Sequence, residues 1–406
     1  MTPPRVAPPP EISRRLTFLL AVAAGVAVGN LYWAQPLLGF IAGDLRVATT
    51  TAGWLVTVTQ IGYAVGILLL VPLGDVLDRR RFVPVMLLAS AVALLLCALA
   101  PSIGLLLLAF GLLGVSTISG QVLTPLAGDL AGDAQRGRVV AAIGSGTLTG
   151  ILVSRTVSGF VAGAAGWRTI FALAAVVAVV LAVVLYRAIP PLAPRTRVSY
   201  PALIVSVGAV VGRERAVRWT LVLAATGFAA FTLLWTALTF LLTGPPFRYP
   251  VSVIGLFGLA GFAAVLAVRY AGRLHDRGWS LPATGAAWTL ALGAFVVAVF
   301  AGRSVVLVVI VVVVIDVALQ GQALLNRARL LAMSDEARSR LNTALSTGNF
   351  IGGAIGSAAA TALWSVGGWT AVSIAGAVLC CFALVVWALG RRGPLVARPA
   401  VSAGSR

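Results

Sequence analysis

The sequence predicts an all-α polytopic membrane protein whose twelve transmembrane helices form two six-helix halves. Composition is the first ground: hydrophobic residues make up 60% of the 406 residues, charged residues only 10%, and the mean hydropathy is +1.03. An ordinary soluble protein carries about 25% charged residues, so a water-soluble multidomain enzyme is excluded. Apolar runs such as Val305 to Ile315 also lack the alternation of a membrane β-barrel.

The second ground is segment length, because crossing the hydrocarbon core takes about 20 mostly apolar residues per helix. Twelve segments meet this requirement, and they span roughly residues 17–41, 51–73, 83–100, 104–128, 139–165, 169–187, 217–243, 250–271, 281–301, 304–328, 341–365 and 369–390. The first is too long for the core of a signal peptide, so we expect it to be retained as a membrane helix.

The third ground is the distribution of arginine, which supplies all 30 basic residues. With both termini in the cytoplasm, 25 arginines fall in cytoplasmic segments and 4 in outer segments, the bias that membrane proteins follow. This bias accounts for most of the net charge of +19, so no nucleic-acid partner is expected. The one remaining arginine, Arg155, lies inside the fifth segment.

A polar stretch rich in proline and arginine, Arg187 to Arg218, divides the chain in the middle. We therefore predict five parts. They are an N-terminal cytoplasmic tail (1–16), an N-terminal six-helix bundle (17–187), a cytoplasmic central loop (188–216), a C-terminal six-helix bundle (217–390) and a C-terminal cytoplasmic tail (391–406).

Short motifs recur between the two halves at a nearly constant offset. Gly120-Gln121 matches Gly321-Gln322 at an offset of 201, and Gly166-Trp167 matches Gly368-Trp369 at 202. Arg136-x-Arg138 likewise matches Arg338-x-Arg340 at 202. Equal spacing with equal topology indicates a parallel repeat about an axis along the membrane normal.

A charged motif lies between the second and third segments. It reads Gly74-Asp75-Val76-Leu77-Asp78-Arg79-Arg80-Arg81, and its second copy reads Gly272-Arg273-Leu274-His275-Asp276-Arg277-Gly278. Matching Asp276 to Asp75 gives the offset of 201 seen above, whereas matching it to Asp78 gives 198. With Asp75 as the motif aspartate, the sequence resembles the major facilitator superfamily over essentially its whole length.

Two further stretches narrow this resemblance. Residues 30–36, Asn-Leu-Tyr-Trp-Ala-Gln-Pro, and residues 337–342, Ala-Arg-Ser-Arg-Leu-Asn, are similar to bacterial twelve-helix efflux permeases, which are often classed with drug:proton antiporters. The resemblance implies a monomeric, multi-pass transporter of the bacterial cytoplasmic membrane. It would export a small amphiphilic drug or metabolite by alternating access, coupled to protons. A sugar or metabolite importer or uncoupled facilitator of the same fold is the alternative.

Among the 11 acidic residues, only Asp316 lies at mid-membrane depth. An ionisable group there costs roughly 2.5 kcal/mol or more, so a functional role is the default hypothesis. We interpret Asp316 as the proton-coupling residue, against the alternative of a structural hydrogen bond between helices. Arg155 is its cationic counterpart, and a pairing in which protonation of Asp316 frees Arg155 for an anionic or polar substrate is a hypothesis. The alternative for Arg155 is snorkelling or capping of backbone carbonyls.

Other polar and aromatic side chains inside the segments could line a central cavity. The predicted set is Arg155, Asn30, Tyr32, Gln35, Gln60, Gln121, Gln320, Asn326, Trp33 and Trp235. Asp316 and Gln320 are four residues apart and so share one helix face. For any single amide, joining two helices is the simpler interpretation.

A cytoplasmic gate is predicted where Asp75, by the family geometry, lies near the N-terminus of the eleventh helix. A carboxylate is favoured there by the helix dipole, and nearby arginines add to the attraction. The predicted gate residues are Asp75, Arg79, Arg81, Asp276, Arg277, Arg338 and Arg340. The simpler interpretation of the arginine run is a topogenic cluster.

Other classes of function are poorly supported. A polytopic membrane enzyme needs a catalytic His–Asp pair or a metal cluster, but the chain has one histidine, His275, and three cysteines without metal-ligand spacing. We therefore expect no metal, no cofactor and no enzyme activity. A Walker-type site needs a lysine, and the chain has none. A receptor or scaffold would leave Asp316 and Arg155 unexplained.

Overall fold

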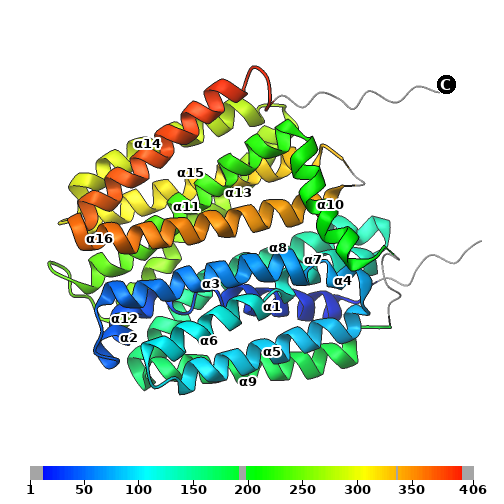
Figure 1. Ribbon diagram of the computed structural model, residues 1–406, viewed down its shortest axis with the longest axis horizontal. Helices are drawn as coiled ribbons and strands as arrows, with labels where there is room; N and C mark the ends of the chain where they lie inside the picture. The colour runs from blue at the N-terminus through cyan, green and yellow to red at the C-terminus, as the bar shows by residue number, and fades with distance from the viewer. Residues whose placement is uncertain (1–11, 192–197, 335–336, 396–406) are drawn as a thin grey trace, which may run out of the picture.

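The structure is a computed structural model that describes residues 12–191, 198–334 and 337–395. Every regular element in these ranges is a helix. The outer parts of the two predicted tails (1–11 and 396–406), a part of the predicted central loop (192–197), and Asp335 and Glu336 lie outside the described residues. The helices run side by side along the long axis of the molecule, the N-terminal half below and the C-terminal half above (Figure 1).

The helices follow the predicted segments closely. The N-terminal half contains α1 (Arg14–Gly29), η1 (Gln35–Leu37), α2 (Leu38–Asp44), α3 (Thr49–Leu70), α4 (Leu73–Val76), α5 (Arg79–Leu99), α6 (Ile103–Ser116), α7 (Ser119–Leu130), α8 (Asp133–Ala165) and α9 (Trp167–Ala188). After α10 (Tyr200–Arg213), the C-terminal half contains α11 (Arg215–Thr243), α12 (Val251–Leu256), η2 (Phe257–Gly261), α13 (Phe262–Asp276), α14 (Ser280–Ala301), α15 (Val305–Leu331) and α16 (Arg338–Gly390).

Within these ranges, 9 helices are long and apolar enough to cross a membrane. One of them, α16, contains two spans, because its backbone leaves the helical region at Gly367 and Gly368. The first span (α1, η1, α2) and the eighth (α12, η2, α13) are interrupted and so add two more. The total is consistent with the twelve predicted crossings.

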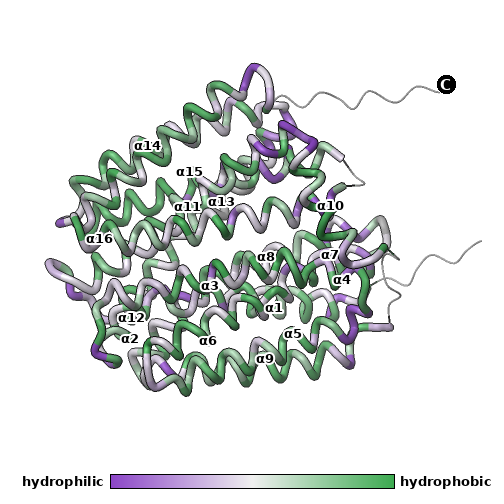
Figure 2. The backbone as a smooth tube through the Cα atoms, viewed as in Figure 1, coloured by the Kyte–Doolittle hydropathy of each residue, from purple (hydrophilic) through white to green (hydrophobic). Residues whose placement is uncertain are grey.

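The distribution of polarity agrees with a membrane location. Figure 2 shows hydrophobic residues along the middle of the helices and hydrophilic residues gathered toward their two ends. Large apolar side chains also face outward from this middle zone, such as Val92, Leu108 and Val378. Contiguous apolar surface of this kind marks a membrane or protein interface.

The first span is broken where a single helix was predicted over 17–41. The α-helix ends at Gly29, and the chain resumes as η1 with Pro36 in it. Proline has no backbone N–H to donate, and irregular backbone is tolerated at membrane depth only where protein buries it. Here Asn30, Tyr32 and Gln35 are all buried, so the break turns polar side chains into the protein interior.

The repeated Gly-Trp motif has the same role in both halves. Gly166 (φ +86°) separates α8 from α9, and Gly368 (φ +56°) lies at the bend inside α16. A positive φ is open to glycine without the penalty that a Cβ would bring. The indole of Trp167 donates to Asp44, and hydrogen bonds from Arg168 and Trp167 hold the pKa of Asp44 below its usual value. The indole of Trp369 donates to the carbonyl of Ala298.

The predicted central loop contains a helix that was not predicted from the sequence. Helix α10 lies across the ends of the other helices (Figure 1) and packs against α16 and α11. The Tyr200 hydroxyl donates to the carbonyl of Leu69 at the end of α3 (2.7 Å). The connection between the halves is therefore attached to both of them.

The two halves meet along two helix pairs. Helix α3 packs on the first part of α16, where the Thr57 and Ser357 hydroxyls are 2.9 Å apart and the Tyr63 and Phe350 rings meet edge to face. On the other side, α8 packs on α12 and η2. The chain enters α1 and leaves α16 at one end of the helices, the right-hand end in Figure 1, which we call the termini side.

Candidate functional site

Arg155 lies between the two halves and is enclosed by aromatic rings. Its side chain projects from α8 and is only 2% exposed. The guanidinium carbon lies 3.9 Å from the ring centroid of Trp235 and 4.8 Å from that of Tyr32. Phe231 adds a third ring at 5.7 Å. Desolvated cation–π contacts of this kind are worth about 2 kcal/mol or more, so these rings replace part of the solvation that the cation loses on burial.

A single amide holds the guanidinium in place. The Nε of Arg155 donates to Oε1 of Gln35 at 2.8 Å. Gln35 is positioned by the break in the first span, since η1 begins at this residue. A continuous helix would point the Gln35 side chain in another direction. The irregular backbone at Pro36 is therefore part of what positions Gln35 at Arg155.

Asp316 contacts the indole N–H of the same tryptophan. It lies on α15, is 2% exposed, and its Oδ1 accepts a hydrogen bond from the indole Nε1 of Trp235 at 3.0 Å. Among the ion pairs of the described residues, none joins Arg155 to Asp316 directly. Trp235 therefore connects the two charges, through its ring face on one and its N–H on the other.

Glycines on the eighth span permit this close approach of the halves. A Cβ added at Gly258 would lie 2.9 Å from the Cβ of Arg155, and one at Gly255 would lie 2.8 Å from the Arg155 carbonyl oxygen. Both distances are shorter than van der Waals contact allows, so a larger residue at Gly255 would push α12 away from α8, and one at Gly258 would push η2 away from α8.

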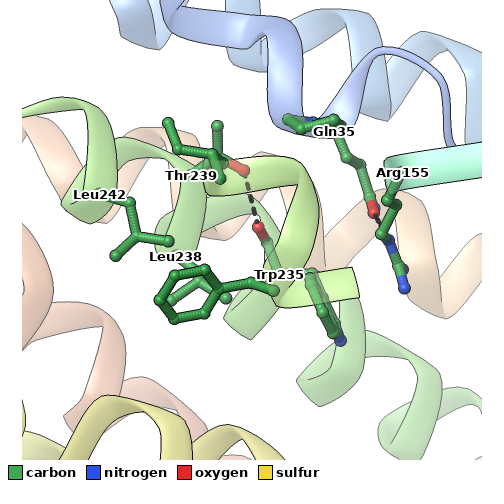
Figure 3. A pocket seen from close by; sticks show the side chains of 9 residues that line it. Gln35, Arg155, Trp235, Leu238, Thr239 and Leu242 are labelled. Atoms are coloured by element: carbon green, nitrogen blue, oxygen red, sulfur yellow. Dashed lines mark hydrogen bonds between the residues drawn. The ribbon is translucent and has the colours of Figure 1, made fainter. Parts of the chain in front are cut away.

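A small pocket adjoins Arg155. It is lined by Gln35, Pro36, Arg155, Trp235, Leu238, Thr239, Leu242, Ile254 and Phe257. It holds about 230 Å³ of empty space, some of it open to solvent. Figure 3 shows Gln35 reaching Arg155 from one side and Trp235 lying beside the guanidinium, with Leu238 and Leu242 on the apolar side. The Thr239 hydroxyl is already committed to the carbonyl of Trp235.

Of the ten residues predicted for the cavity, the structure brings together Arg155, Tyr32, Gln35 and Trp235. In the same first span, Asn30 donates to Thr117 (3.0 Å) and accepts from Trp33 (2.9 Å), so these side chains bond to each other and to the end of α6. Phe231 was not predicted from the sequence. Its position four residues before Trp235, on the same face of α11, was the available signal.

The remaining predicted amides lie elsewhere. Gln121 donates to the Tyr63 hydroxyl at 3.3 Å, and Asn326 donates to Gln322 on its own helix. Gln60 is fully buried in α3, and within the described part of the chain neither of its amide atoms has a hydrogen-bond partner. Gln320 is half-buried, one turn beyond Asp316.

On the termini side, the predicted gate residues separate into two groups. The Asp75 carboxylate accepts from the Ser339 hydroxyl in the first turn of α16 (3.4 Å), a hydrogen bond that joins the two halves. Arg79, by contrast, is buried and pairs with Asp129 of its own half at 2.7 Å. Asp129 was not among the predicted residues.

The other predicted gate residues occupy the same side. Arg81, Asp276 and Arg277 are exposed. Arg338 and Arg340 lie in the first turn of α16, beside Ser339.

These features define a helical membrane protein with two repeated halves and a buried charged site between them. The chain belongs to the Major Facilitator Superfamily, whose sequence pattern matches residues 18–328. It is therefore a transporter of small molecules, and the resemblance predicted from its sequence is confirmed.

Relatives and solved structures agree with this assignment. The chain is 40% identical over 377 residues to the putative uncharacterized transporter YgaY of Escherichia coli (strain K12), covering 93% of this chain and 96% of that protein. It is 32% identical over 363 residues to the probable transporter SCO4007 of Streptomyces coelicolor, covering 89% and 84%.

Two solved structures share the fold at 14% identity. A bacterial homologue of the human lysosomal transporter Spinster, inward-facing and occupied, has a TM-score of 0.77 and covers 93% of this chain and 96% of its own. The nucleoside transporter NupG (D323A mutant) has a TM-score of 0.72 and covers 93% and 99%.

Proposed function

We propose that this protein is a proton-coupled secondary transporter that moves a small amphiphilic molecule by alternating access, with Asp316 as the proton site. One observation carries the proposal. Trp235 and Asp316 belong to the C-terminal half, whereas Arg155, which stacks on Trp235, belongs to the N-terminal half. In a transporter built from parallel repeats, the halves rock about a fixed central site, so any such movement must change the contact between Arg155 and Trp235.

Protonation of Asp316 would act on the same contact. The neutral acid attracts the indole N–H less than the carboxylate does, since hydrogen bonds to charged groups are the stronger ones. It also removes the negative charge that balances Arg155. The protonated state thus favours release of Trp235 from Asp316 and of Arg155 from Trp235, which couples the proton to the approach or separation of the halves.

The resemblance to efflux permeases favours export in exchange for protons. Transport in the same direction as the proton is the second candidate, and the buried cation favours it, since Arg155 would attract an anion that arrives with the proton. In either case the protein acts as a monomer in the bacterial cytoplasmic membrane with both termini in the cytoplasm, and it catalyses no reaction.

Proton flux in liposomes tests the proposal. Protein is reconstituted with the pH dye pyranine inside, and candidate compounds are added outside. Exchange makes the lumen more alkaline as the compound enters, whereas co-transport makes it more acidic. We expect Asp316→Asn to reduce the compound-induced flux to the level of protein-free liposomes.

Glu214→Gln is the matched control, because Glu214 is an exposed carboxylate between α10 and α11. It should behave as the wild type. If Asp316→Asn retained wild-type flux, Asp316 would have no part in coupling.

A further inference from the structure

The pocket beside Arg155 contains two unused donors. Within the described part of the chain, Nη2 of Arg155 and Nε2 of Gln35 are buried without a hydrogen-bond partner, and both residues are at most 2% exposed. Among the residues that line the pocket, Arg155 and Gln35 are the only ones with a buried polar side-chain atom that lacks a partner in that part of the chain. A buried donor left unsatisfied costs about 1–3 kcal/mol, more if charged, so the pocket is built for an acceptor.

The two donors belong to one hydrogen-bonded unit. Gln35 accepts from Arg155 Nε through Oε1, and among the described residues neither the Gln35 NH₂ group nor Nη2 of Arg155 has a hydrogen-bond partner. An acceptor that meets both groups needs two oxygens or one oxygen with two lone pairs. A carboxylate fits this description, and its negative charge would pair with the positive charge of Arg155.

Charge balance distinguishes an anion from a neutral or cationic ligand. The charged and titratable groups that bear on Asp316 are Arg155 and, beyond it, the Tyr32 phenol. With Asp316 ionised and the pocket empty, the site is neutral. With Asp316 protonated and an anion on Arg155, it is neutral again. Either the proton alone or the anion alone leaves a net charge inside the membrane, which is costly.

The lining of the pocket also bears on the body of the ligand. Apart from the donors, the lining is aliphatic and aromatic, with Leu238, Leu242, Ile254 and Phe257. These residues fit a short apolar body attached to the charged group.

We propose that the pocket binds a small organic monoanion, such as a carboxylate with a short apolar body, between Arg155 and Gln35, and that this anion crosses the membrane together with the proton of Asp316. The inference rests on the proposed proton coupling at Asp316, and it selects co-transport over exchange. The halves can rock when the site is electrically neutral, which is so when it is empty with Asp316 ionised and when it holds both the anion and the proton.

Binding is tested on purified protein in detergent with matched ligands. Benzoate, benzamide and benzamidine have nearly the same shape and are anionic, neutral and cationic; butyrate, hexanoate and benzenesulfonate extend the anionic series. We expect anions of the series to raise Tm by several degrees, more at pH 6 than at pH 8, and benzamide and benzamidine to leave it unchanged. A series in which no anion raises Tm overturns the proposal.

Two variants separate binding from folding. Arg155→Gln should abolish the anion-dependent rise in Tm. Gln35→Glu keeps the side-chain shape and supplies a carboxylate to Arg155, so it should abolish the rise while unfolding at or above the wild-type temperature. Anion binding that survives in a folded Gln35→Glu protein contradicts the assigned site. Glu214→Gln should retain wild-type binding.

Transport of benzenesulfonate distinguishes this inference from the proposed function, because this anion does not cross lipid as a neutral acid. We expect the lumen of pyranine liposomes to become more acidic as it enters, and not with Asp316→Asn. Asp316-dependent proton flux that occurs with benzamide or benzamidine but with no anion would contradict the proposed anionic substrate and would still support proton coupling at Asp316. Anion binding with unchanged flux in Asp316→Asn would overturn proton coupling instead.

Discussion

At the scale of single residues, Trp235 connects two side chains that the sequence could identify only separately. Arg155 and Asp316 were predicted because charged residues are rare inside membrane segments, and the positive-inside bias of the loops does not account for either of them. Their common partner could not be predicted, since the bonds that define the site join residues 81 and 120 positions apart. Trp235 was predicted only as aromatic surface of the cavity, whereas in the structure its N–H donates to Asp316.

Replacing Trp235 by phenylalanine separates its two contacts. Phenylalanine keeps a ring for Arg155 but donates no hydrogen bond to Asp316. A hydrogen bond to a charged group is worth about 1.5–3 kcal/mol, and one pH unit corresponds to about 1.4 kcal/mol. We therefore expect half-maximal proton-coupled flux in Trp235→Phe liposomes to move about one pH unit or more toward alkaline pH.

Trp235→Leu removes the ring as well and is the comparison for that measurement. It should also lower the affinity for the transported compound. An unshifted pH profile in Trp235→Phe would show that the indole N–H does not influence the proton site.

At the scale of elements, the spans were predictable and the irregularities were not. Segment limits agree with the helices to within a few residues because length and hydropathy determine a membrane helix. The breaks at residues 30–36 and 257–261 depend on what packs around them, and the sequence shows only Pro36 and scattered glycines. Helix α10 was not predicted, because the prolines and arginines that flank it are typical of a loop and the whole stretch was assigned as one.

Close packing of α1 against α8 depends on particular glycines. A Cβ at Gly146 would overlap the backbone at Ala21, whereas a Cβ at Gly144, half a turn away, meets nothing within 4 Å. Overpacking typically costs about 1–3 kcal/mol, so Gly146→Ala should lower the free energy of unfolding by that amount. Thermal unfolding in detergent measures it.

Gly144→Ala is the matched control on the same helix. Replacing a helical glycine there gains about 0.5–1 kcal/mol, so this variant should be as stable as the wild type or slightly more stable. Equal destabilisation by both changes would mean that helix flexibility matters and close packing does not.

At the scale of the whole molecule, the repeat predicted from short motifs appears as repeated structure. The two Gly-Trp pairs both adopt positive φ at a junction between spans. The site itself is asymmetric, and motif matching could not have located it, because its residues differ between the halves. Which side of the membrane the termini face remains a prediction from the arginine counts.

Reporter fusions test that orientation. Alkaline phosphatase is active only outside the cytoplasm, so a fusion after Arg303 should be active and a fusion after Arg277 inactive. A C-terminal green fluorescent protein should fluoresce. The opposite pattern would reverse the orientation and with it the direction inferred for proton-coupled transport.

The contact between Thr57 and Ser357 has a meaning for how the two halves diverged. Ser357 occupies, at the repeat offset of 202, the position that Arg155 occupies in the first half. One copy of that position bears the buried cation, and the other bears a hydroxyl that bonds across to α3. If the halves descend from a duplicated six-helix unit, the two copies of this position have acquired different roles. The copy in the first half lines the site for the transported molecule, and the copy in the second half holds the two halves together.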